Sequence, residues 1–177
     1  MSIRNKEGNE MAPIIQIVGY KNSGKTTLIT RLLEMFHAMN LRVAVIKHDV
    51  HGFEVDREGT DTYRHREAGA AAAAIVSPWR TAIVEERETP LAGLIGHFQA
   101  YDLILVEGFK REPYPKMVLL RSAEDASLLT ELNGVCAVVY REGEIPELEQ
   151  LKQPGLRCFE RNDLDGIAAF LKQHVLV

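Results

Sequence analysis

The stretch IIQIVGYKNSGKTT, residues 14–27, contains the strongest structural signal in the chain. Its first five residues form an apolar run between Pro13 and Gly19, which predicts a β-strand. Residues 19–26 then match the pattern G-x-x-x-x-G-K-[ST] at every fixed position. Residues 25–39 place apolar side chains at spacings of four, three and four, which predicts a helix with one apolar face. A strand, a glycine-containing turn and a helix in this order predict a phosphate-binding loop.

The residue types of this loop suit a triphosphate. Glycines allow the backbone to curve until consecutive N–H groups point at phosphate oxygens, and the following helix adds its positive N-terminal end. We expect Lys25 to contact the β- and γ-phosphates and the Thr26 hydroxyl to bind Mg²⁺. The residues predicted to hold the phosphates are Gly19, Tyr20, Lys21, Asn22, Ser23, Gly24, Lys25 and Thr26. The alternative is a strand-to-helix turn that binds nothing.

A buried strand predicted at residues 102–106 leads to the second half of this site. Glu107 directly follows that apolar run, where a phosphate-binding loop needs an acid on the Mg²⁺ side, so Lys25 and Glu107 are the predicted catalytic residues. Gly108 is expected to bring a backbone N–H to the γ-phosphate. Asp56 and Asp61 are further candidates for the same metal, and each can equally be a loop acid or a helix cap. For Glu107, the alternative is a surface side chain at a strand end.

Short apolar runs alternate with segments of helical period along the rest of the chain. Strands are predicted at 42–47, 70–76, 80–85, 116–120 and 135–139, and helices at 60–67, 90–99 and 162–173. The alanine-rich segment 70–76 also has helix propensity, but its Ile-Val end before Ser-Pro favours a strand. This alternation predicts an α/β protein in which a mostly parallel sheet is flanked by helices. Together with the phosphate-binding loop, it predicts a three-layer P-loop NTPase fold. Residues 12–177 are expected to form a single nucleotide-binding domain, preceded by a flexible N-terminal extension, residues 1–11.

Composition excludes several classes of protein. The chain has 177 residues and a formal net charge of −4, without a long Lys/Arg block, which argues against binding nucleic acid by bulk charge. Its longest apolar run, residues 70–76, is far shorter than the roughly 20 residues that span a bilayer, so no membrane segment is predicted. Cys136 and Cys158 are not in a Cys-x-x-Cys arrangement, and two thiols in a reducing cytoplasm are the favoured interpretation.

A group of basic and histidine side chains follows the second predicted strand. They are expected to line an anion-receiving or partner-contacting surface beside the nucleotide: Lys47, His48, His51, Arg64 and Arg66. The alternatives are a solvated loop and helix face, or a metal held by the two histidines, for which spacing provides no third ligand. The motifs do not identify the purine, because neither D-x-x-G nor N-K-x-D is present at the expected places.

Beyond the phosphate-binding loop, several blocks of sequence have a recognisable combination. From residue 14 to the C-terminus, the chain resembles the molybdopterin-guanine dinucleotide biosynthesis protein B family, whose members are small GTP-binding adapters of molybdenum-cofactor assembly. The blocks that carry the resemblance are GYKNSGKTT (19–27), VIKHDVHGF (45–53), YRHREAGA (63–70) and VEGFK (106–110), together with Asp56, Gly59 and Asp61. Thr60 and Thr62 depart from it, because lysine and serine are expected there.

The resemblance implies a homodimer that binds GTP with Mg²⁺, hydrolyses it slowly, and assists a guanylyltransferase in attaching GMP to molybdopterin. It also implies that Thr27 joins the phosphate site and that Thr26 and Glu107 serve Mg²⁺. No residue is evident as a general base for the attacking water, which predicts slow turnover. A partner or the second subunit is expected to supply an arginine such as Arg64 or Arg66. The alternatives are a small-molecule kinase, or a metallochaperone GTPase that delivers nickel.

Overall fold

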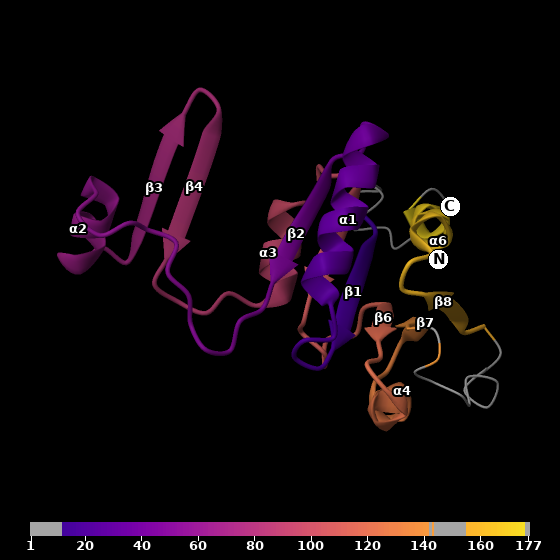
Figure 1. Cartoon of the computed structure of the whole chain (residues 1–177). Helices are drawn as coiled ribbons and strands as arrows, with labels where there is room; N and C mark the ends of the chain where they lie inside the picture. The colour runs from indigo at the N-terminus through magenta and orange to yellow at the C-terminus, as the bar shows by residue number, and fades with distance from the viewer. Residues whose placement is uncertain (1–11, 142, 144–154, 176–177) are drawn as a thin grey trace. The chain divides into compact units, whose positions relative to one another are not determined.

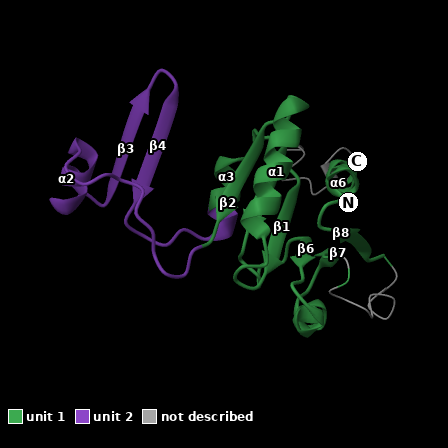
Figure 2. Ribbon diagram, in the orientation of Figure 1, with its two compact units in different colours: residues 1–48, 94–177 green, residues 49–93 purple. Residues whose placement is uncertain are grey.

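The computed structural model describes residues 12–141, 143 and 155–175. Within the predicted domain the chain forms two compact units (Figure 2). The first, which we call the sheet unit, comprises residues 1–48 and 94–177, and the second, the hairpin unit, comprises residues 49–93. The predicted flexible extension, residues 1–11, lies outside the described residues.

The sheet unit contains a six-stranded sheet in which every pair of neighbouring strands is parallel. In spatial order the strands are β2 (Val43–Lys47), β5 (Leu103–Glu107), β1 (Ile14–Gly19), β6 (Lys116–Leu119), β7 (Val135–Tyr140) and β8 (Arg157–Glu160). The pairing places Ile17 opposite Glu107 and Gly19 opposite Leu119. The carboxyl ends of β1, β5 and β6 therefore meet at one edge, which is where ligands of such sheets bind. The predicted parallel sheet is confirmed.

The central strands are buried because apolar layers cover both faces of the sheet. Ile15 and Ile17 of β1 pack in a core cluster with residues of α1 (Lys25–Ala38) and α6 (Leu164–Val175). Figure 1 shows α1 beside β1 and β2. Val18 belongs to a second cluster that includes Leu128 of α4 (Leu128–Glu131). Successive side chains of a strand point to opposite faces, so one apolar strand serves both layers. The three-layer α/β fold predicted from the sequence follows from this arrangement.

The hairpin unit has its own small sheet. β3 (Ala72–Ser77) pairs antiparallel with β4 (Arg80–Glu85), and α2 (Asp61–Glu67) precedes them. Both strands were expected at these places, but they form a separate two-stranded sheet rather than joining the parallel one. The reason is the two-residue connection between Ser77 and Arg80, which permits only antiparallel pairing, whereas parallel neighbours need a long crossover.

Helix boundaries agree closely with the sequence-based expectations. Thr60 is the N-cap of α2, and its hydroxyl accepts a hydrogen bond from the Tyr63 amide. At the start of α6, Asp163 Oδ1 accepts one from the Gly166 amide at 2.9 Å. The expected helix at 90–99 is α3 (Leu91–His97), which crosses the boundary between the two units.

Three short elements were not predicted. They are η1 (Ala123–Ser127), α4 and β8. None is longer than five residues, which is too short for a hydrophobic period to be recognised.

In the part of the chain that the structure describes, no helix has the length and apolar character needed to span a membrane. Cys136 and Cys158 are both thiols rather than half-cystines.

Candidate functional site

The turn between β1 and α1 has the backbone conformation of an anion-binding loop. Asn22 and Gly24 have positive φ angles of 63° and 89°, which curve the chain before the first turn of α1. Gly19 is closely packed, because a Cβ there would lie 2.6 Å from Ser23 Oγ and 2.7 Å from the Leu119 carbonyl oxygen. A side chain at this position is therefore excluded by the loop itself.

The Lys25 ammonium lies against the inside of this loop. Its Nζ donates to the carbonyl oxygens of Tyr20 at 2.7 Å and Gly19 at 3.2 Å, and to Ser23 Oγ at 3.4 Å. Burial lowers the pKa of Lys25, while the nearby Glu107 carboxylate opposes that shift. Three further cations, Lys110, Arg121 and Lys47, add to the lowering. The loop mouth is therefore a region of concentrated positive charge, which suits a phosphate group.

Thr26 and Glu107 are brought together although they are far apart in the sequence. The Thr26 hydroxyl donates to Glu107 Oε1 at 2.9 Å, and Glu107 is only 8% exposed at the end of β5. A hydroxyl and a carboxylate beside a phosphate loop are hard oxygen donors of the kind that Mg²⁺ prefers. In residues 12–141, 143 and 155–175 no group of three or more His, Cys, Asp and Glu forms a metal site. The Thr26 hydroxyl and the Glu107 carboxylate are compatible with a Mg²⁺ ion whose other ligands would come from phosphate and water.

The segment after β5 is held by groups from two other strands. Gln16, buried in β1, donates through Nε2 to the carbonyl oxygens of Phe109 at 2.6 Å and Gly108 at 3.2 Å. The His48 ring stacks on Phe109 with a centroid distance of 4.4 Å. The Gly108 amide, expected at the γ-phosphate, donates to the Ile17 carbonyl oxygen at 3.1 Å. A phosphate contact from this amide requires that hydrogen bond to break on binding.

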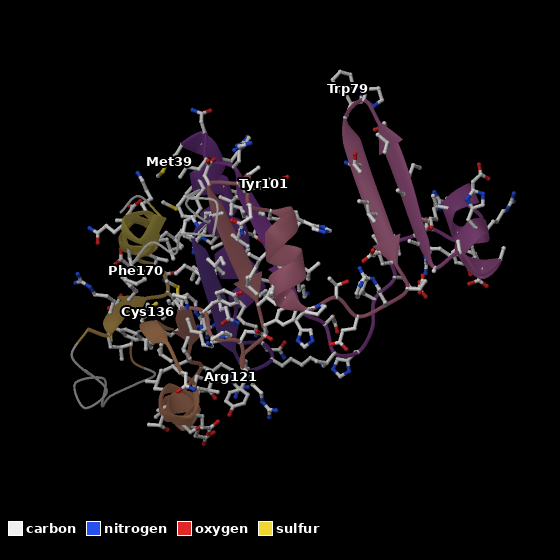
Figure 3. The ribbon with its side chains drawn as sticks, turned by 180° about the vertical axis from the view of Figure 1, so that it is seen from behind. Met39, Trp79, Tyr101, Arg121, Cys136 and Phe170 are labelled. Atoms are coloured by element: carbon white, nitrogen blue, oxygen red, sulfur yellow. The ribbon has the colours of Figure 1, made fainter. Side chains whose placement is uncertain are left out.

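Two cations enclose the second residue of the phosphate loop. Lys110 Nζ lies 4.3 Å from the centroid of the Tyr20 ring, and the Arg121 guanidinium carbon lies 5.1 Å from it. Arg121, labelled in Figure 3, is fixed by a bidentate pair with buried Asp125, with both N–O distances 2.8 Å. The Arg121 hydrogen bonds hold the pKa of the Asp125 carboxyl below its usual value, against the opposing effect of burial. The cluster keeps two positive charges near the loop mouth.

The remaining predicted site residues divide between the units. In the sheet unit, Lys47 is the last residue of β2 and His48 follows it. The hairpin unit contains the other four, which are His51, Asp61, Arg64 and Arg66. Their contribution to a nucleotide site stays a prediction.

Local contacts in the hairpin unit engage several of these side chains. Asp61 pairs with Arg64 at 4.0 Å on the surface of α2. Arg66 pairs with Glu86 at 2.5 Å and with Asp56 at 3.7 Å. The same Asp56 carboxylate accepts from the Thr60 and Thr62 hydroxyls, each at 3.0 Å. Thr60 and Thr62, the two positions at which the sequence departs from the pattern that it resembles, thus organise this loop.

Several residues near the loop were not predicted from the sequence. Gln16 has a detectable signal, because it is a polar residue inside an apolar strand. Lys110 and Arg121 have none, because their placement depends on how β5 and β6 end beside β1. The same holds for Glu160 and Arg161, which lie at the end of an unpredicted strand.

Comparison with known proteins agrees with this geometry. Residues 14–141 match the family model described as molybdopterin guanine dinucleotide synthesis protein B. The chain is 37% identical, over 91% of its length and 92% of the other chain, to a probable molybdopterin-guanine dinucleotide biosynthesis adapter protein of Bacillus subtilis. It is 38% identical over 120 residues to the molybdopterin-guanine dinucleotide biosynthesis adapter protein of Escherichia coli, covering 64% of this chain and 69% of that one.

Solved structures show the same similarity. The crystal structure of MobB from Bacillus subtilis superposes with a TM-score of 0.75 at 34% identity, covering 92% of this chain and 98% of the other. A hydrogenase maturation factor HypB from Archaeoglobus fulgidus has a TM-score of 0.53 at 16% identity, a likeness that extends to the fold alone.

Proposed function

The chain belongs to the molybdopterin guanine dinucleotide synthesis protein B family, and on that basis we propose that it serves as an adapter in the biosynthesis of molybdopterin guanine dinucleotide by binding GTP with Mg²⁺. In this role it assists a guanylyltransferase that attaches GMP to molybdopterin, and it hydrolyses GTP slowly. The observation that carries the proposal is the convergence of Lys25, Thr26 and Glu107 at one edge of the sheet.

The chain's own groups would divide the work of holding a triphosphate. The backbone between Gly19 and Thr27 and the N-terminal end of α1 would receive the phosphate oxygens. Lys25 would exchange its hydrogen bonds to the Gly19 and Tyr20 carbonyl oxygens for phosphate oxygens, because a charge-assisted bond to an anion is stronger than one to a neutral carbonyl. Thr26 and Glu107 would hold Mg²⁺, which neutralises charge on the β- and γ-phosphates.

Slow hydrolysis is proposed because positioning and charge are present without a dedicated water-orienting side chain. Gly108, Phe109 and Lys110 follow Glu107, so the place occupied by a water-orienting glutamine in fast GTPases has no equivalent in this segment. Arg64 and Arg66 remain the proposed source of an additional positive charge from a second subunit. An adapter that signals by its nucleotide state does not need rapid turnover.

A homodimer is part of the proposal and is supported by the hairpin unit. Val76 is 72% exposed and Trp79 is 93% exposed, and Figure 3 shows Trp79 at the turn between β3 and β4. Ile75 and Ile83 add further exposed apolar surface on the same two strands. Apolar side chains gathered on a small two-stranded sheet are typical of an interface, because an isolated hairpin is only marginally stable in water.

Calorimetric titration of the full chain tests the proposal. GTP should bind with Mg²⁺ more tightly than ATP does, and Lys25→Ala should abolish binding, whereas Lys172→Ala on α6 should leave it unchanged. Analysis of the products after incubation with GTP should detect GDP and phosphate. A phosphorylated small molecule would instead indicate a kinase. Unaltered GTP affinity in Lys25→Ala would remove the proposed site, and tighter binding of ATP would remove the assignment of GTP.

A further inference from the structure

A cavity of about 490 Å³ opens beside the phosphate loop, within the roughly 300–1,000 Å³ typical of small-molecule sites. On one side it is lined by the start of α1 and the loop, including Asn22, Gly24 and Thr27. On the other side it is lined by residues at the carboxyl ends of β7 and β8, namely Arg141 and Glu160. A nucleotide whose phosphates lie in the loop has its nucleoside within reach of this cavity.

Arg161 connects the cavity to the phosphate loop. Its backbone N–H donates to the Tyr140 carbonyl oxygen at 2.7 Å, and its guanidinium donates to the Leu120 carbonyl oxygen at 3.4 Å. The guanidinium packs so closely on the loop that a Cβ at Gly24 would lie 3.3 Å from Nη1. Strand-end contacts on both sides therefore fix a planar cation at the base of the cavity, where it can stack on a planar ring.

The polar groups of the cavity match the edge of guanine. Glu160 lines the cavity, and within the described part of the chain its carboxylate makes no hydrogen bond or ion pair with another side chain. A carboxylate can accept two hydrogen bonds side by side, which matches the N1–H and 2-amino donors of guanine. Adenine presents a lone pair at N1, so the same carboxylate repels it. Arg141 also lines the cavity, and arginine is the residue type that donates to the O6 and N7 acceptors of guanine.

We propose that this cavity holds the nucleoside of the bound nucleotide and that Glu160 selects guanine by accepting hydrogen bonds from its N1–H and 2-amino groups. The inference rests on the proposed nucleotide-binding function and adds to it the residue that sets base preference. It also gives a reason for Arg161, which would hold the plane of the base next to the phosphate loop.

The test is calorimetric titration of the full chain with GDP, IDP, XDP and ADP in the presence of Mg²⁺. Wild type should bind GDP about tenfold or more tightly than IDP, which lacks the 2-amino group, because a hydrogen bond to a charged group is lost. ADP should bind more weakly than either. Glu160→Gln should bind GDP about tenfold more weakly and should bind XDP more tightly than wild type does, because the new amide can donate to the 2-oxo group.

Two controls separate base selection from a structural effect. Glu34→Gln changes a glutamate on α1, outside the cavity lining, and should keep the wild-type order of affinities. Glu160→Ala should lose the preference for GDP over IDP without gaining XDP binding.

Each outcome decides between the proposals. Binding of GDP with the same GDP, IDP and XDP ratios in wild type and Glu160→Gln would overturn the role of Glu160 and leave the nucleotide site intact. If Glu160→Gln weakened the binding of every nucleotide by the same factor, the role of Glu160 in base selection would also be overturned, because the residue would then have a structural role. Equal affinity of wild type for GDP and IDP would show that the protein does not recognise the 2-amino group of guanine. This result would hold even if a variant did not fold. Wild type that binds no nucleotide would remove the proposed function itself.

Discussion

Glu107→Gln should separate the affinity for GTP from its dependence on Mg²⁺. The carboxylate is 8% exposed and accepts a hydrogen bond from Thr26 at 2.9 Å, so the amide can occupy the same space and keep that bond. What changes is the charge. Any loss of GTP affinity in the variant therefore has an electrostatic cause and does not come from altered packing.

The two conditions should respond in opposite directions. Without Mg²⁺, Glu107 repels phosphate and attracts the Lys25 ammonium, so its neutralisation should make GTP bind more tightly. With Mg²⁺, the variant loses a charged partner of the metal, and about 1.5–3 kcal/mol for an interaction with a charged group corresponds to a loss of roughly ten- to a hundredfold in affinity. Mg²⁺ should thus strengthen GTP binding strongly in wild type and much less in the variant.

The assay is titration of wild type and Glu107→Gln with GTP in EDTA and in excess Mg²⁺. Glu131→Gln, which changes an exposed glutamate at the end of α4, serves as the matched control and should behave as wild type. If Mg²⁺ strengthens GTP binding equally in wild type and Glu107→Gln, the carboxylate does not serve the metal, and the reasoning from the Thr26 contact is wrong.

Other perturbations have equally definite outcomes. Gln16→Met removes two hydrogen bonds to the Gly108–Phe109 segment and should lower the free energy of unfolding by about 1–3 kcal/mol in chemical denaturation, and an unchanged denaturation midpoint would show that Gln16 does not hold that segment. Asp125→Ala should also lower the free energy of unfolding near neutral pH by about 1–3 kcal/mol. Because the pKa of Asp125 is lowered on folding, its contribution is present above the unfolded value of 3.8 and is lost as the pH falls through the lower folded pKa, so stability curves of wild type and variant should converge at acid pH. Val76→Asp in the hairpin unit should convert a dimer to a monomer in light scattering, whereas a dimer that persists would place the interface elsewhere.

Local signals were sufficient to predict most of the fold and to name the residues of the candidate site. The loop residues from Gly19 to Thr26 could be recognised because the motif, the preceding strand and the following helix are contiguous. Glu107 could be inferred because an acid directly after a buried strand stands at the edge of the sheet where ligands bind. The strands at 80–85 and 135–139 were placed almost to the residue, since their apolar runs are bounded by turn-forming segments.

Pairing of distant strands was beyond the reach of those signals. β3 and β4 have the composition of strands that join a sheet, and only their antiparallel register sets them apart from the parallel one. Glu160 and Arg161 lie at the end of a four-residue strand with no recognisable period. Their position beside the loop depends on β8 pairing with β7 at the far edge of the sheet.

Sequence alone therefore determines the local conformation of the phosphate loop, because glycine conformation, helix start and lysine position are set by neighbours within a few residues. Tertiary structure establishes what surrounds the loop: the Thr26–Glu107 contact, the hold of Gln16 on the next segment, and the cavity that contains Glu160. The physical reason is that these groups come from strands whose order in the sheet, β2-β5-β1-β6-β7-β8, differs from their order in the chain, and long-range pairing alone decides it.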